Sequence, residues 1–586
     1  MALFGILFVI FSANFGQDSV AGAYSGIKSS QAAIARAESQ EPSSSATDER
    51  SAFDVKRYDI NLRIDPAARS ITGSVTTQAI ARGSELKAIT LDLEDLMVVT
   101  SVTSEGRDLA FSHKDNLLRI MLAQSYRSGA PFAVTVNYRG TPAGKAFVFG
   151  EHQSIPMIYT YGLPNTARQW WPCKDTPAEK ADSVDLTITA PEQVDAPSTT
   201  AGDKHVSIPL IVASNGKLVK ETRNSDGTRT FYWQVRYPIY PDVVSLAITN
   251  YNTFTLSYQY SPAQSMQMIF YVYPEDLEKA KADFSVLPDI MQTYAAIFGP
   301  YPFLKEKYGV AEFSVNSFRE HQTLPSYGAA RITGDHRNDF ILAHELAHQW
   351  FGDSISVKNW SHVWLNEGFA TYAFALWREH RDGKEAYLAA MRKFDRNDFR
   401  GSIFISNERD EDKLFSATTF YKAAWVLHMV RHVMGDEAFF RALKKYVKTF
   451  AYKNAGTGDY QAVCEKEYGR SLNWFFKEWI YGTGSPQYKY HWTVSRAGNK
   501  YALELTVDQV QQDSGVFAMP LDVVVTTSTG ERKFVIWNTL KSQRFEFSLD
   551  EPVRQVLLDR EGWILKKAPA VDASGTWNDG GTDWKL

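Results

Sequence analysis

His344-Glu345-Leu346-Ala347-His348 is the stretch on which the interpretation of this sequence depends. Asn338 and Asp339 precede it and can cap a helix, and Gly352 follows it and can end one. On such a helix, residues four apart lie on one face, so both imidazoles can reach a single ion while Glu345 lies one step round. Five residues are few enough to match by chance, so the stretch alone suggests a metal site without proving one.

A candidate third ligand, Glu367, lies nineteen residues after His348 in a helix-compatible segment that begins at Trp364 and runs to about Arg381. A turn between two antiparallel helices would bring its carboxylate beside both imidazoles. That set has three protein ligands and one open position for water, which is the catalytic type of zinc site. We therefore expect one zinc ion per chain, held by His344, His348 and Glu367. The alternative is a pair of helices whose His and Glu side chains are only solvated or paired with one another.

The expected zinc site has a defined chemistry. Zinc bound there lowers the pKa of its water to about 7. Glu345 can take the proton and later deliver it to a leaving amine. Hydrolysis of peptide bonds is the reaction that this arrangement serves, so we expect a zinc metallopeptidase that acts on peptides. His336 and His362 are expected to be surface or supporting groups.

The chain around the motif is long enough for several domains, because its 586 residues exceed what one hydrophobic core usually supports. The alternating pattern over 53–256 predicts an antiparallel β domain, and the helical spacing over 257–485 predicts a thermolysin-like, mainly helical catalytic domain. Strand patterning returns over 486–567 and predicts a β-sandwich, and 568–586 is a tail without periodicity. The expected fold class is multidomain α+β.

Charge and cysteine content exclude other classes of protein. The net charge of −4 and the absence of a long basic run argue against nucleic acid as a partner. Cys173 and Cys464 are the only cysteines, which rules out a disulfide framework and a cysteine zinc site; both are expected to be buried and inert. The sequence does not indicate the oligomeric state.

The N-terminal region, 1–52, predicts a signal peptide followed by a flexible linker. Ala2–Ala13 is an apolar run of signal-peptide length, and Ala21-Gly22-Ala23 matches a cleavage pattern, so we expect export to a periplasm or outside the cell. No Lys or Arg precedes the run, and the alternative is a frayed or buried N-terminal segment. The run is too short to span a membrane, and no other segment is apolar enough.

Three further segments carry a resemblance to a known family: Trp171-Pro172-Cys173-Lys174-Asp175-Thr176-Pro177, Tyr308–Tyr327, and Lys422–Gly435. Together with the zinc motif they make residues from about Phe53 to Pro486 resemble the gluzincin aminopeptidases, which include aminopeptidase N and leukotriene-hydrolase-like enzymes. The resemblance implies a saddle-like β domain on a thermolysin-like catalytic domain. It also implies an aminopeptidase, which releases residues from the N-terminus of a peptide.

The motif that recognises the substrate N-terminus departs from the family. Where the family usually has Gly-Ala-Met-Glu-Asn, this chain has Ser317-Phe318-Arg319-Glu320-His321. The resemblance implies that the retained Glu320 pairs with the α-ammonium of the substrate. Arg319 either neutralises Glu320 or points elsewhere and binds an acidic group of the substrate, and the sequence leaves both open.

A second departure concerns the tyrosine whose hydroxyl stabilises the oxyanion in the family. Alignment on Lys422 places Phe420 there, and Tyr421 lies about 100° further round a helix. Tyr421 is therefore a candidate catalytic donor, with a packed aromatic as the alternative. Leu163 lies near where many relatives have a Gln or Glu that helps to hold the substrate amine.

These departures leave alternatives beside the aminopeptidase. One is the same zinc centre with another specificity, as an endopeptidase or an enzyme for modified peptides. Another is a weakened, peptide-binding protein, because loss of an oxyanion donor typically lowers the rate by about 10² to 10³. The preferred N-terminal residue is not indicated by the sequence.

Overall fold

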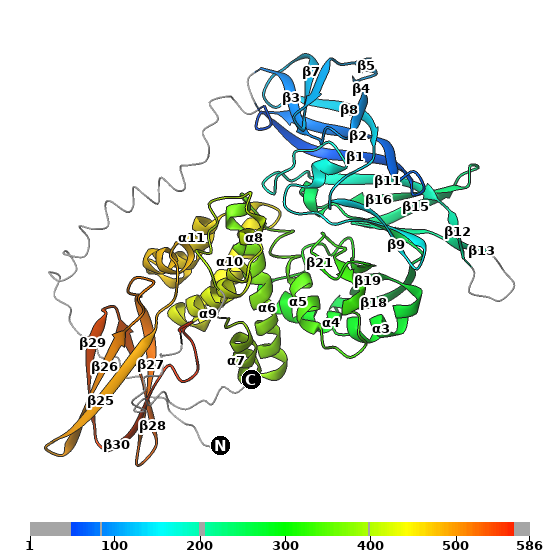
Figure 1. The fold of residues 1–586 in the computed structure, drawn as a ribbon. Coiled ribbons are helices and arrows are strands. Elements are labelled where there is room, and N and C mark those ends of the chain that lie inside the picture. The colour runs from blue at the N-terminus through cyan, green and yellow to red at the C-terminus, as the bar shows by residue number, and fades with distance from the viewer. Residues whose placement is uncertain (1–48, 83–84, 198–204, 397–398, 568–586) are drawn as a thin grey trace. The chain divides into compact units, whose positions relative to one another are not determined.

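The computed structural model describes residues 49–82, 85–197, 205–396 and 399–567 (Figure 1). The predictions of a signal peptide and of most of the linker, and that of the C-terminal tail, lie outside the described residues. Glu49, near the predicted linker's end, is already anchored, because its carboxylate accepts hydrogen bonds from Arg119 Nε and Nη2 and from Thr90 Oγ1.

The N-terminal part is rich in β-strands, as predicted. Its largest sheet has the order β15-β16-β11-β1-β2-β8-β4-β5, and β1 pairs with β2 antiparallel and with β11 parallel. Alternate residues of β1, such as Tyr58, Ile60 and Leu62, are buried, which is the expected result of a two-residue period. The strands are β1 (Phe53–Asp65), β2 (Ser70–Ala81), β3 (Leu86–Asp92), β4 (Val98–Ser104), β5 (Arg107–Asp108), β6 (Phe111–Lys114), β7 (Leu117–Tyr126), β8 (Pro131–Gly140), β9 (Phe147–His152), β10 (Ile155–Thr160), β11 (Ser183–Pro191), β12 (Gln193–Pro197), β13 (His205–Pro209), β14 (Ile211–Ser214), β15 (Lys217–Arg223), β16 (Thr228–Val235) and β17 (Leu246–Thr249).

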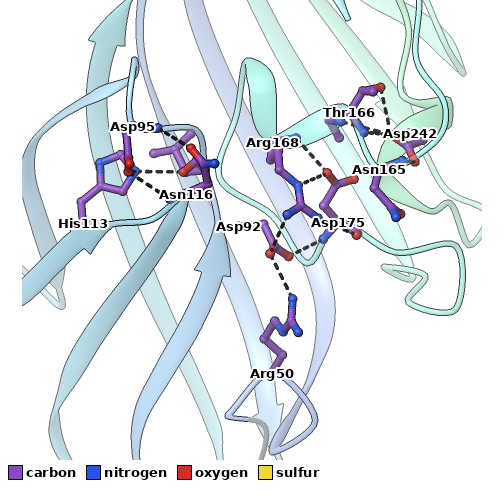
Figure 2. Close-up of polar contacts among 12 residues, drawn as sticks. Arg50, Asp92, Asp95, His113, Asn116, Asn165, Thr166, Arg168, Asp175 and Asp242 are labelled. Carbon is purple, nitrogen blue, oxygen red and sulfur yellow. Dashed lines mark hydrogen bonds and ion pairs between the residues drawn. The ribbon is translucent and has the colours of Figure 1, made fainter. Parts of the chain in front are cut away.

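Buried carboxylates hold the long connection between β10 and β11 in place (Figure 2). Asp242 accepts hydrogen bonds from three successive backbone N–H groups, those of Asn165 (2.7 Å), Thr166 (2.7 Å) and Ala167 (3.0 Å). Further along, Arg168 reaches Asp175 at 2.7 Å and Asp92 at 3.4 Å. Such contacts satisfy backbone donors that a buried loop would otherwise leave unpaired. Leu163 of this connection reaches the functional site.

The central part contains the helices predicted from the zinc motif, and also a five-stranded sheet that the sequence did not reveal. The sheet order is β18-β19-β20-β22-β21. The strands are β18 (Asn252–Ser261), β19 (Gln264–Val272), β20 (Tyr308–Phe313), β21 (Phe318–Arg319), β22 (Ser326–Gly328), β23 (Ser356–Val357) and β24 (Asn454–Ala455). The helices are α3 (Leu277–Phe284), α4 (Leu287–Phe298), α5 (Asp339–Ala347), α6 (Trp364–Asp382), α7 (Lys384–Lys393), α8 (Glu411–Leu414), α9 (Ala423–Met434), α10 (Asp436–Phe450), α11 (Thr457–Tyr468) and α12 (Asn473–Phe476), with π-helical turns η6 (Thr418–Lys422) and η7 (Lys477–Tyr481).

The expected border between the first two domains, at residues 256 and 257, falls inside β18. That strand pairs antiparallel with β19, which pairs parallel with β20, so the β18–β19 hairpin belongs to the central sheet. Its alternating pattern resembles that of the preceding strands, which is why periodicity alone extended the first domain too far. The helical spacing that follows β19 belongs to two helices, because α3 ends at Phe284 and α4 begins at Leu287.

The C-terminal part consists of strands, as predicted, in two three-stranded sheets with orders β25-β26-β29 and β28-β27-β30. Phe534 of one sheet contacts Phe547 of the other, with ring centroids 4.7 Å apart. After the last strand, Trp563 stacks on His428 of α9 at 4.6 Å. The strands are β25 (Tyr488–Ala497), β26 (Lys500–Gln509), β27 (Met519–Thr527), β28 (Glu531–Asn538), β29 (Ser542–Leu549) and β30 (Val553–Leu558).

Two smaller expectations can be compared with the described residues. Cys173 and Cys464 are both buried and free, and burial raises the pKa of each thiol, which keeps them protonated. Among the helices that the structure describes, none combines the length and apolar character needed to cross a bilayer.

Candidate active site

The zinc motif lies on α5 and at its C-terminal end. His344 and Glu345 are in the helix, and His348 follows it directly. The backbone N–H of His348 donates to the backbone carbonyl of His344 at 3.2 Å. The helix ends at Ala347, earlier than Gly352 suggested, and the Asn338 side chain donates to the Arg331 carbonyl instead of capping the helix. After a turn, α6 begins at Trp364 and places Glu367 in its first turn.

The structure brings the three expected ligands together in the interior. The Nε2 atoms of His344 and His348 are 3.0 Å apart, and Glu367 Oε2 lies 3.3 Å from the first and 3.5 Å from the second. All three side chains are buried. Among the residues that the structure describes, His344, His348 and Glu367 form a group of side chains close enough together to hold one metal ion.

These separations fit a zinc ion. Zinc bonds of about 2.0–2.2 Å at tetrahedral angles place neighbouring ligand atoms about 3.3 Å apart, and the observed separations lie on either side of that value. Both imidazoles are also oriented for coordination. His348 Nδ1 donates to the Phe351 carbonyl at 3.0 Å, and His344 Nδ1 faces Thr371 Oγ1 at 3.5 Å, so each Nε2 is left to the metal. His344, His348 and Glu367 therefore form a potential zinc-binding site.

The charges around this cluster favour a cation. Burial acts to raise the pKa of Glu367, but the two imidazoles outweigh it and lower that pKa to about 2, so the carboxylate is ionised. Burial acts to lower the pKa of His348, but Glu367 and Glu320 outweigh it and raise that pKa to about 10. Burial lowers the pKa of His344, which stays neutral. A positive charge is thus stabilised where the three ligand atoms meet.

Glu345 is placed to act on a group at this cluster. It is buried, and its Oε2 atom has no hydrogen-bond partner among the described residues. Burial raises the pKa of Glu345 well above its usual value, and the nearby Glu320 and Glu367 carboxylates add to this effect. A buried carboxylate with an unused oxygen and a raised pKa is suited to accept a proton and give it back.

The cluster opens into a cavity of about 390 Å³. Its lining combines the three ligands and Glu345 with side chains from the β domain and from the helical region. The other lining residues are Lys145, Leu163, Ser317, Phe318, Arg319, Glu320, Glu411, Asp412, Phe415 and Phe420. Sequence reasoning missed four of these residues, because they approach the site only through the tertiary fold: Lys145, Glu411, Asp412 and Phe415.

Four residues of the motif expected to recognise the substrate N-terminus, Ser317 to Glu320, line this cavity, whereas His321 lies outside the described lining with its Nδ1 3.1 Å from Ser326 Oγ. Glu320 follows β21 directly and is buried, and burial raises the pKa of its carboxyl. Arg319 does not form an ion pair with it. Instead, Arg319 Nε donates to the Tyr161 carbonyl at 3.0 Å, and the guanidinium lies over the Tyr161 ring, 3.9 Å from its centroid. Of the two alternatives for Arg319, the structure thus supports the one in which it points away from Glu320.

The structure does not support Tyr421 as the oxyanion donor. Phe420 lines the cavity and stacks on His344, with ring centroids 5.8 Å apart and planes 13° from parallel. Tyr421 is absent from the described cavity lining and stacks on Phe394 at 5.6 Å. Adjacent residues on the helical turn η6 point in different directions, so only one of the pair reaches the site. Leu163 is also in the lining, as its mapping suggested.

Comparisons with known proteins agree with this arrangement. The model of the peptidase M1 N-terminal domain matches residues 55–239, and that of the peptidase family M1 domain matches residues 308–479. Aminopeptidase M1-B of Oryza sativa subsp. japonica is 25% identical over 462 residues, covering 73% of this chain and 50% of its own length. The chain thus spans about half the length of the first curated relatives it matches.

Two solved structures share the fold. The M1 zinc metallopeptidase from Deinococcus radiodurans has a TM-score of 0.61 at 23% identity, covering 74% of this chain and 95% of its own. Legionella pneumophila aminopeptidase A, in complex with aspartic acid, has a TM-score of 0.75 at 18% identity. The match covers 89% of this chain and 60% of the Legionella chain. A β domain followed by helices that carry two His and one Glu ligand corresponds to the gluzincin class that the sequence resembles. The chain belongs to peptidase family M1.

Proposed function

We propose that the protein is a zinc aminopeptidase that removes N-terminal residues from peptides. One observation carries the proposal: a single cavity contains the three ligand side chains, the Glu345 carboxylate with its unused oxygen, and the buried Glu320. Zinc bound at the three ligands would supply a water acidic enough to be deprotonated near neutral pH.

The other residues of the cavity have separate parts in the proposed reaction. Glu345 accepts the proton from the attacking water and returns it to the leaving amine. Glu320 pairs with the α-ammonium of the substrate, which selects free N-termini and excludes longer segments on that side. A buried carboxylate is a strong partner for an ammonium, because the interaction takes place in a medium of low dielectric constant.

The test combines metal analysis with substrate cleavage. The purified protein is expected to contain one zinc per chain and to hydrolyse aminoacyl p-nitroanilides, and a chelator should abolish turnover until zinc is restored. Glu345→Gln should retain zinc and lower kcat by about 10² to 10⁴. Glu385→Gln, an exposed residue of α7, is the matched control and should keep full activity. A zinc-loaded protein that cleaves no member of a broad peptide library would refute the proposal.

The same centre with another specificity is distinguished by blocking the N-terminus. An aminopeptidase that uses Glu320 must lose a peptide when its α-amine is acetylated, because the ammonium charge is removed. An endopeptidase or an enzyme for modified peptides would cleave both forms. Comparing the two forms of one peptide by mass spectrometry separates these possibilities and locates the cleaved bond.

Phe420 favours a second candidate, a peptide-binding protein with weakened catalysis. Its ring lies against His344 in the cavity and offers no hydroxyl to a developing oxyanion. If this candidate is correct, peptides bind without turnover, and Glu345→Gln leaves their affinity unchanged. Turnover that disappears in Glu345→Gln excludes it.

We also propose export, from the N-terminal apolar run and the Ala21-Gly22-Ala23 pattern. N-terminal sequencing of the mature protein, recovered from fractionated cells and from the medium, tests this. A mature chain that still begins at Met1 inside the cell would contradict it.

A further inference from the structure

Arg319 is a cation in the cavity that lacks an anionic partner. It lines the cavity from β21, and within the described residues its guanidinium makes no ion pair with a carboxylate. The other cation of the described lining, Lys145, is paired with Glu411. A half-buried, unpaired guanidinium is unfavourable unless another group completes its hydrogen bonds.

The guanidinium is held in one orientation by contacts with backbone carbonyls and a ring. Nε donates to the Tyr161 carbonyl at 3.0 Å, and Nη1 donates to the Phe318 carbonyl at 2.9 Å. The Tyr161 ring, over which the guanidinium lies, is itself held by a 2.8 Å hydrogen bond from its hydroxyl to Ser317 Oγ. These contacts leave Nη2 without a partner among the described residues. A planar group fixed in this way loses little further freedom when it binds an anion.

Glu320 does not satisfy this charge, although it is the next residue. Its carboxylate makes no ion pair with Arg319, and both side chains line the same cavity. The cavity therefore presents the Glu320 carboxyl group and, beside it, the guanidinium of Arg319 without an ion-pair partner to whatever enters it. A ligand that carries both an ammonium and a carboxylate complements this arrangement, and each charge-assisted contact adds selectivity.

Resting on the proposed function, we propose that Arg319 binds a carboxylate of the substrate. A short peptide offers two such groups: the side chain of an N-terminal Asp or Glu, and the free C-terminus of a dipeptide. The chemistry of recognition is the same for both, a guanidinium donating hydrogen bonds to a carboxylate while Glu320 binds the α-ammonium.

Two substrate pairs distinguish these sources. The first is glutamyl against glutaminyl p-nitroanilide, which differ only in the side-chain charge. The second is Ala-Ala against its C-terminal amide, which differ only in the terminal charge. In at least one pair the charged substrate is expected to have a kcat/KM about 10- to 100-fold higher than the neutral one.

Arg319→Gln should bring that ratio close to one. Arg319→Lys should give an intermediate ratio, because an ammonium keeps the charge and loses the planar pair of donors. The matched control is Arg337→Gln, an exposed residue ahead of α5 that is paired with Asp335 and lies outside the described lining; it should keep the wild-type ratio.

Equal rates for the two members of both pairs in the wild type would overturn the proposal. So would Arg319→Gln lowering kcat by the same factor for charged and neutral substrates, because Arg319 would then act on the reacting carbonyl or on the fold. If no substrate is cleaved at all, the proposed function fails. Isothermal titration calorimetry on the zinc-loaded protein then tests separately whether Arg319 binds a carboxylate. Tighter binding of glutamyl amide than of glutaminyl amide, or of Ala-Ala than of its amide, supports Arg319 as a carboxylate site, and equal affinities in both pairs refute it.

Discussion

Gly368, the residue after the ligand Glu367, allows α6 and α9 to approach closely. A Cβ atom at this position would lie 2.6 Å from the Cβ of Ala423 and 3.3 Å from its carbonyl carbon. Neither atom belongs to a flexible side chain that can turn away. The substitution Gly368→Ala therefore forces the helices apart beside the metal site.

The size of the effect follows from three magnitudes. Ordinary contact begins at 3.4 Å, so the helices must separate by about 0.8 Å, the difference between 3.4 and 2.6 Å. Overpacking of this kind costs about 1–3 kcal/mol, and the better helix propensity of alanine offsets about 1 kcal/mol. The free energy of unfolding should then fall by only about 0–2 kcal/mol. Ligand distances tolerate about 0.2 Å, so zinc affinity should fall more clearly, by about tenfold or more.

Competition with a chromophoric chelator measures the zinc affinity, and urea denaturation of the metal-free protein measures stability. The matched control is Gly458→Ala on α11, where a Cβ atom meets nothing within 4 Å. It should leave zinc affinity unchanged and stabilise the protein by up to about 1 kcal/mol. If Gly368→Ala binds zinc as tightly as the wild type, the close contact with α9 does not position Glu367 and the reasoning is wrong.

Three other changes have defined outcomes. Burial raises the pKa of Glu312 from its usual 4.5 to about 8, so between these values the folded protein holds a proton that the unfolded chain has lost. The free energy of unfolding should fall as pH rises through that window, by up to about 1.4 kcal/mol per pH unit. Urea denaturation at several pH values measures this dependence, which should be weaker in Glu312→Gln. The same dependence in the variant and the wild type would contradict the prediction. Phe420→Tyr adds a hydroxyl beside His344 and should raise kcat on alanyl p-nitroanilide by up to about 10² to 10³, whereas a fall would show that the hydroxyl cannot reach the oxyanion. Asp242→Ala leaves three backbone N–H groups without their acceptor and should lower the free energy of unfolding by at least about 2 kcal/mol, and a denaturation midpoint equal to the wild type would argue against this role.

The metal cluster was predictable because its geometry is local. His344 and His348 are one helical turn apart, and Glu367 needs only one more helix to return to them, so spacing alone placed all three at one point. The general order of β, helical and β regions followed from periodicity for the same reason. Such patterns are set by residues that are neighbours in the sequence.

The rest of the site depends on contacts that no local pattern encodes. Arg319 is oriented by Tyr161, which is 158 residues away in the sequence. Phe420 and Tyr421 are adjacent, and they lie on a π-helical turn, where the register of a regular helix does not hold. The β18–β19 hairpin has the same alternation as the preceding strands, and only its pairing with β20 assigns it to the central sheet.

The hydrogen bonds from the β10–β11 connection to Asp242 fix a segment of the β domain that helps to form the cavity. The connection carries the Tyr161 carbonyl and Leu163, and it is fastened to the helical region where Asn165 Oδ1 accepts the Trp360 indole N–H at 2.9 Å. Substrate preference should then depend on the β domain as well as on the metal-bearing helices. A chimera that exchanges only the β domain with that of a relative should shift the substrate preference toward the donor's while every zinc ligand stays in place.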